Sequence, residues 1–269
     1  MINIPKEVYI VNYISIVIWI GIVLLVLVIG KRNNKIGCFR DKMIGNWKQS
    51  LTIAVVSYIS VFIGAWDISY LTNIFGPIEV FCQCLIGLTI AKSIGGFEPL
   101  HVTKAVIEHK QKWRKIILMV AFGLLIAFLS LVIGQLSQSL CQNLFGEVVN
   151  SSEAIKMLPP NKWLVFFTLL AGAGIAEEAV YRLVFLSLFW RLTHNRWTAI
   201  ILSSLIFGLY HLTPLSAMYQ VFWQYPISQF VSTSLVGIIF GYFYSKRGYE
   251  TAVIGHTFAD WIPVMLFMK

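Results

Sequence analysis

Charged residues are scarce in this chain: they make up 12% of its 269 residues, against 58% hydrophobic residues, and the mean hydropathy is +0.76. A soluble domain usually carries about 25% charged residues. The apolar residues form many long runs, which indicates a helical membrane protein with several spans. A β-barrel would show short alternating segments, and a soluble α/β fold would need shorter runs broken by charged faces. We therefore expect an all-α bundle of transmembrane helices.

Cysteine is also scarce, and its spacing gives no metal or disulfide signature. The chain has four cysteines, and Cys82 and Cys84 are two residues apart, which points them to different sides of a helix. The His-Glu-x-x-His signature of zinc proteases is absent, since Tyr210 precedes His211. We expect no bound metal and no cofactor, although one ligand from each of three helices can hold zinc.

Eight apolar segments approach the length of about 20 residues that a bilayer requires. The first is followed by Lys31 and Arg32 and not by a small-residue cleavage site, so we interpret it as a retained span. A polar stretch, Ser137–Asn161, separates N-terminal spans over residues 1–136 from a C-terminal part over residues 160–269. Without an internal repeat, one membrane domain over residues 1–269 is the simplest account. The predicted spans are Val8–Ile29, Ser50–Trp66, Pro77–Ala91, Lys115–Leu136, Lys162–Trp190, Trp197–Thr213, Tyr219–Tyr244 and Thr251–Met268.

The net charge of +9 is concentrated in alternate loops between these segments. Lysine and arginine follow spans one, five and seven and precede span four, whereas the loops around Asp67–Gly76 and Ser137–Asn161 contain few of them. With both termini outside, every basic loop falls on the cytoplasmic side, as the positive-inside rule requires. The charge thus indicates contact with the lipid bilayer and not with nucleic acid.

Ionisable residues interrupt the C-terminal spans in three pairs, each spaced by four residues. A carboxylate in hydrocarbon costs at least ~2.5–3.5 kcal/mol, so such residues indicate function by default. The spacing of four places both members of a pair on one helical face. The pairs are Glu178 with Arg182, directly after Glu177; Phe207 with His211; and His256 with Asp260.

Depth estimates bring these pairs close together. Glu177 and His211 each lie roughly 20 Å from the cytoplasmic ends of their helices at ~1.5 Å per residue, whereas His256 lies at only ~12 Å. A buried glutamate can deprotonate water, and a histidine can hold that water and move a proton. A second histidine can donate to an oxyanion, while Arg182 keeps Glu178 charged. The set therefore predicts amide hydrolysis by activated water, without a serine or cysteine nucleophile.

In this order, the three motifs resemble those of the CPBP family, also called Abi, which comprises CAAX-processing and bacteriocin-processing intramembrane glutamic endopeptidases. The resemblance covers about residues 160–269. It implies that Glu177 activates water with help from His211, and that His256 and Asp260 form the oxyanion side. Glu178 and Arg182 would be a structural and electrostatic pair, and Phe207 would pack beside the site. Eukaryotic members typically have Asn where this chain has Asp260, and an ionised Asp cannot donate to an oxyanion. We expect Asp260 to accept from His256 and fix its tautomer.

Several alternatives remain open. The implied substrate is a membrane-associated peptide or protein, such as a pheromone or bacteriocin precursor, and the cytoplasmic membrane of a bacterium is the expected location. The chain can instead be a non-catalytic partner or immunity protein that binds another membrane protein. Glu177, Glu178 and Arg182 can also be a buried ion network that only joins helices. A proton-coupled carrier is a further hypothesis, which the lack of an inverted repeat disfavours.

Overall fold

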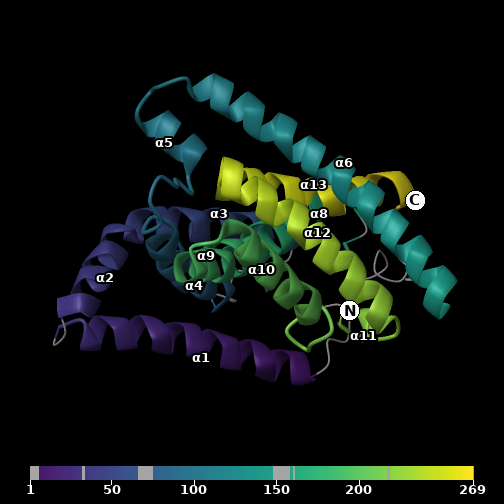
Figure 1. Ribbon diagram of the computed structural model, residues 1–269, viewed down its shortest axis with the longest axis horizontal. Coiled ribbons are helices and arrows are strands. Elements are labelled where there is room, and N and C mark those ends of the chain that lie inside the picture. The colour runs from purple at the N-terminus through teal and green to yellow at the C-terminus, as the bar shows by residue number, and fades with distance from the viewer. Residues whose placement is uncertain are drawn as a thin grey trace.

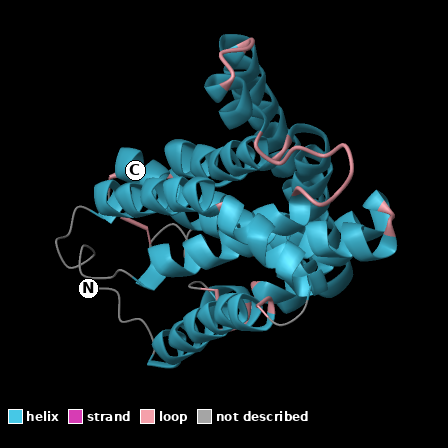
Figure 2. Cartoon of the chain, turned by 90° about the vertical axis from the view of Figure 1, so that its left-hand side faces the viewer, coloured by secondary structure: helices cyan, strands magenta, loops and turns pink. Residues whose placement is uncertain are grey.

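Helices are the only regular secondary structure in the residues that the structure describes, as the hydropathy predicted (Figures 1 and 2). This computed structural model describes residues 6–31, 34–65, 75–147, 158–159, 161–216 and 219–268. Its α-helices (α) and π-helical segments (η) are α1 (Lys6–Ile29), α2 (Asn34–Gly45), α3 (Trp47–Ala65), α4 (Phe75–Ala91), α5 (His101–Ile107), α6 (Lys112–Phe145), α8 (Lys162–Leu169), η2 (Leu170–Glu177), η3 (Ala179–Leu186), α9 (Ser187–Thr193), α10 (Arg196–Tyr210), α11 (Tyr219–Phe222), α12 (Pro226–Arg247) and α13 (Tyr249–Phe267).

Several of these helices have the properties of membrane spans. By length and composition, α6, α12 and the continuous helix Lys162–Thr193 can cross a bilayer. The outer face of α6 is apolar over its length: Ile117, Phe128 and Leu136 are each more than 60% exposed. Such a surface suits lipid and not water. The chain is therefore a multi-pass membrane protein. Shorter apolar helices cover Tyr13–Ile29, Gly76–Ala91 and Arg196–Tyr210.

Each of the eight predicted spans contains a helix, but the prediction that each span is one continuous helix was wrong for one of them. The predicted span Tyr219–Tyr244 is divided: α11 ends at Phe222, and α12 begins at Pro226. Proline has no backbone N–H and a fixed φ, so it fits the first turn of a helix and not its interior. The sequence also gave no sign of the short helices α2 and α5, which lie within the basic segments.

The predicted polar stretch Ser137–Asn161 begins later than expected. Helix α6 continues through Phe145 and ends at Gly146, whose φ of 72° is the left-handed conformation that glycine favours at a helix C-terminus. Residues 148–157 and 160 of that stretch lie outside the described residues, as does 66–74, which is most of the predicted loop Asp67–Gly76.

The C-terminal helices gather around η2 and η3. Helix α13 packs against α6 and η2, α10 packs against α12 and η3, and α4 packs against η3 and α3. Figure 1 shows α10, α12 and α13 between the long helix α6 and the outlying helix α1, which contacts α4 and α2. The polar residues of η2, η3, α10 and α13 therefore face one another across a shared interior.

The helix that carries the glutamates is not a regular α-helix. Between α8 and α9 it is π-helical from Leu170 to Glu177 and again from Ala179 to Leu186. A π-helix bonds residue i to residue i+5, so each turn holds more residues and the helix advances less per residue; such segments are rare and frequent at functional sites. Gly174 lets α13 approach this helix closely: a Cβ at this position would lie 3.2 Å from the Val253 carbonyl oxygen of α13.

Candidate active site in the membrane interior

Glu178 and Arg182 form a fully buried ion pair. Both side chains have no exposed surface, and Arg182 Nε lies 3.1 Å from Glu178 Oε2. Their spacing of four residues keeps them on one side of the helix, as the sequence predicted. An isolated charge would be very costly here, so the pair fixes the carboxylate in its ionised form and in one orientation.

His256 joins α13 to both glutamates. Its Nδ1 lies 2.9 Å from Glu178 Oε1, which makes a buried hydrogen bond between residues 78 apart in the sequence. Its Nε2 lies 3.9 Å from Glu177 Oε2 and 3.7 Å from Asp260 Oδ2. Three carboxylates therefore surround one imidazole ring, and the ring's position is set by Glu178.

The prediction for the hydrogen-bond partner of His256 was wrong. We predicted that Asp260 accepts a hydrogen bond from His256, but Glu178 takes that position and Asp260 lies beyond hydrogen-bond distance. The Asp260 side chain is 43% exposed, whereas His256 is nearly buried. The spacing of four residues brings Asp260 near the ring, but a fully buried carboxylate on another helix holds the ring more firmly.

His211 is the C-cap residue of α10. This helix ends at Tyr210, three residues before the predicted end of the span at Thr213. Its Nδ1 lies 2.9 Å from the Phe207 carbonyl oxygen, which can only accept, so Nδ1 carries the proton and Nε2 is left as an acceptor. The edge of Phe207 meets the His211 ring at 4.7 Å between centroids. Within the described residues no direct hydrogen bond or ion pair joins His211 to Glu177.

Aromatic rings enclose the charged groups. Arg182 Cζ lies 4.9 Å from the Phe207 centroid and 5.7 Å from that of Phe240. The Phe240 ring also lies 4.4 Å from the ring of His256. A desolvated cation–π contact is worth about 2 kcal/mol, and it matters here because the Arg182 guanidinium nitrogens make no hydrogen bond to the described residues. Phe207 thus packs beside the site as expected, while Phe240 was missed, since a phenylalanine inside an apolar span carries no sequence signal.

Two tyrosines take part in hydrogen bonds that stabilise the π-helical segments. The Tyr249 hydroxyl donates to the Ile175 carbonyl oxygen at 2.8 Å. Ser187 Oγ lies 2.7 Å from the Tyr244 hydroxyl and donates to the Arg182 carbonyl oxygen at 3.2 Å. In a membrane, backbone groups must be satisfied within the protein, so these side chains stabilise the irregular helix that places the two glutamates.

The site gathers acidic and histidine side chains, but no group of three or more of the described histidine, cysteine, aspartate and glutamate residues has an arrangement suited to holding a metal ion. The geometry can nevertheless orient an imidazole, keep one carboxylate charged, and leave a second carboxylate accessible. Glu177 is the accessible one: its side chain is 20% exposed, whereas that of Glu178 is completely covered.

Comparison with known proteins identifies the same part of the chain. Residues 159–262 match the model of the family described as type II CAAX prenyl endopeptidase Rce1-like. The match includes all seven residues of the three motifs and leaves out the N-terminal helices α1 to α6. No curated protein and no solved structure gives a significant match. Over residues 159–262 the chain is therefore similar to the Rce1-like family of CAAX prenyl endopeptidases, in agreement with the resemblance of the three motifs to the CPBP family.

Proposed function

We propose that this protein is an intramembrane glutamic endopeptidase that hydrolyses a peptide bond of a membrane-associated peptide or protein. The observation that carries the proposal is the difference between two adjacent carboxylates. Glu178 is covered and engaged by Arg182 and His256, whereas Glu177 is partly exposed and has no ionic partner closer than 3.9 Å within the described residues. One carboxylate is therefore structural, and the other is free to exchange a proton with water.

In the first step, Glu177 accepts a proton from a water molecule while the water oxygen forms a bond to the carbonyl carbon of the substrate. Nε2 of His211 is the second acceptor that can hold this water, because Nδ1 already donates to the Phe207 carbonyl. No covalent enzyme intermediate is formed in this scheme, so none of the chain's serines or cysteines has to act as a nucleophile.

The oxyanion that results is stabilised from the opposite side by His256. With both ring nitrogens protonated, Nδ1–H donates to Glu178 and Nε2–H donates to the oxyanion. The carbon–nitrogen bond then breaks, and the proton held by Glu177 passes to the leaving amine. Asp260, at 3.7 Å from Nε2, stabilises the charged ring electrostatically and does not donate to the substrate.

Residues 160–269 form the catalytic core in this proposal, within a single membrane domain over residues 1–269. The packing of α4 against η3 and of α3 against η2 supports a bracing role for the N-terminal spans in 1–136. We further propose eight spans with both termini outside, in the cytoplasmic membrane of a bacterium, with maturation of a peptide precursor or self-immunity as the role. Chemistry that uses no metal is part of the proposal.

The test is cleavage by the purified protein in detergent, with a library of quenched peptides and precursors of membrane peptides. Wild type is compared with Glu177→Gln, each with and without a chelator. The matched control is Glu147→Gln, since Glu147 lies outside the three motifs and accepts a hydrogen bond from the Ser228 backbone N–H. We expect cleavage that resists the chelator, persists in the control and is lost in Glu177→Gln.

If the chelator abolishes cleavage, the enzyme depends on a bound metal ion, and the mechanism in which Glu177 alone activates water is refuted. Cleavage that persists in Glu177→Gln would refute the catalytic assignment. A cellular phenotype that survives in Glu177→Gln would instead support the alternative, a non-catalytic partner or immunity protein that acts by binding another membrane protein.

A further inference from the structure

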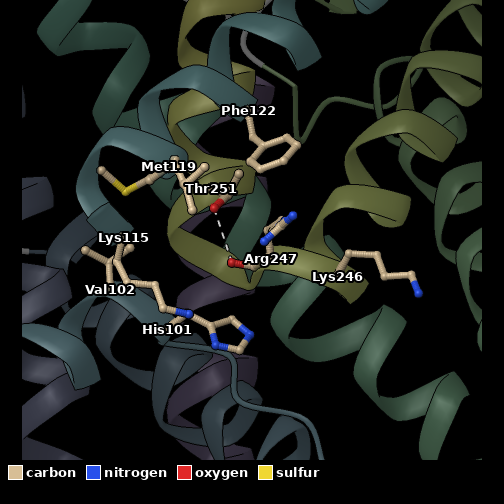
Figure 3. A pocket seen from close by; sticks show the side chains of 9 residues that line it. His101, Val102, Lys115, Met119, Phe122, Lys246, Arg247 and Thr251 are labelled. Atoms are coloured by element: carbon tan, nitrogen blue, oxygen red, sulfur yellow. Dashed lines mark hydrogen bonds between the residues drawn. The ribbon is translucent and has the colours of Figure 1, made fainter. Parts of the chain in front are cut away.

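A hollow separate from the glutamate site opens where α5, α6, α12 and α13 meet (Figure 3). None of the seven motif residues lines it. Its walls combine the cationic side chains of Lys115 and Arg247 with the His101 imidazole and with apolar side chains such as Met119 and Phe122.

The cationic groups come from segments that are far apart in the sequence. In Figure 3 the Lys115 side chain lies beside the His101 ring, Arg247 lies below Phe122, and Lys246 extends away. Arg247 Cζ is 4.1 Å from the centroid of Phe122. Stacking on a ring restrains the guanidinium while leaving its N–H groups available, because these donate in the plane of the group.

Lys115 and Arg247 form no ion pair in the described part of the chain. The Glu250 carboxylate accepts hydrogen bonds from the backbone N–H groups of Val102 and Thr103. Burial lowers the pKa of His101, and the Lys115 and Arg247 charges lower it further, while the Glu98 carboxylate raises it.

The hollow lies at the ends of the long apolar helices. Helix α6 begins at Lys112, and α12 ends at Arg247, so both cations lie near the level where hydrocarbon gives way to headgroups. On the α6 wall of the hollow, Met119 and Phe122 follow Lys115 toward the middle of the helix and make that wall apolar. A molecule bound here therefore meets donors for an anion at one end and an apolar surface at the other.

We propose that this hollow binds the phosphate of an anionic phospholipid, with the acyl chains leaving it past Met119 and Phe122. Arg247 supplies a planar pair of donors that fits phosphate oxygens, and Lys115 supplies a second charge. Basic pockets between transmembrane helices suit such headgroups. The inference does not depend on proteolysis.

The test is lipid binding to the purified full chain, followed by native mass spectrometry. Phosphatidylglycerol and phosphatidylcholine with the same acyl chains are titrated, and inorganic phosphate is added as a competitor in a separate series. We expect one tightly held phosphatidylglycerol. Each basic residue near the surface contributes about 1 kcal/mol, so Lys115→Gln with Arg247→Gln should weaken its binding about 30-fold.

The matched control removes the same charge from exposed basic residues outside the hollow, in Lys48→Gln with Arg191→Gln, and should bind as wild type does. The conservative pair Lys115→Arg with Arg247→Lys keeps both charges and checks that loss of binding is not loss of fold. Equal binding of the two lipids, or equal weakening in the control, would overturn the proposal. Displacement of the lipid by millimolar phosphate would reassign the hollow to a free anion.

Discussion

The buried Glu178–Arg182 pair allows a prediction about stability that is independent of any substrate. Glu178→Gln keeps the shape of the side chain and leaves the Arg182 guanidinium without its counter-ion, in a position with no exposed surface. Removing one partner of a buried pair typically costs about 3–5 kcal/mol, because the other charge is left uncompensated. We therefore expect Glu178→Gln to lower the free energy of unfolding by about that amount.

The double variant, Glu178→Gln with Arg182→Met, should be more stable than Glu178→Gln alone. It leaves no uncompensated charge, and methionine occupies the space beside the Phe207 and Phe240 rings that Arg182 now contacts. The assay is unfolding in micelles by titration with a denaturing detergent, followed by circular dichroism. Strict additivity of the two changes would mean that the residues are not coupled, and it would refute the reasoning.

Further changes test the remaining contacts. Glu177→Gln should lower kcat about 10²–10⁴-fold with little loss of stability, because its partly exposed side chain acts as a base. Asp260→Asn should retain most of the cleavage activity, since the site histidine is held by Glu178. Tyr249→Phe should cost about 1 kcal/mol of unfolding free energy, because it removes the hydrogen bond to the η2 backbone. Gly255→Ala should be destabilising by about 1–3 kcal/mol, since its Cβ would lie 2.7 Å from the Ile126 side chain.

The sequence predicted those features that depend on local spacing or on apolar length. The helical segments and the Glu178–Arg182 pair follow from hydropathy and periodicity. The family match over residues 159–262 agrees with a resemblance that rested on three short motifs. These are contacts within one helix, or properties of one segment, so they need no knowledge of how the helices pack.

Contacts between helices were harder to predict from the sequence. Depth counting at ~1.5 Å per residue placed His256 about 8 Å from the level of Glu177, yet Nε2 lies 3.9 Å from its carboxylate. The π-helical segment Ala179–Leu186 accounts for part of that difference, because it advances less per residue than an α-helix. The hydrogen bond between His256 and Glu178 and the stacking of Phe240 follow only from the packing of α12 and α13 around that helix.

The most direct test of the proposed chemistry is a comparison of cleavage rates between wild type and Glu177→Gln after both are shown to have the same stability in micelles. A glutamate that activates water predicts a loss of at least about 100-fold in the variant, with unchanged binding of the substrate. A variant that cleaves at the wild-type rate would contradict the assignment of Glu177 as the base.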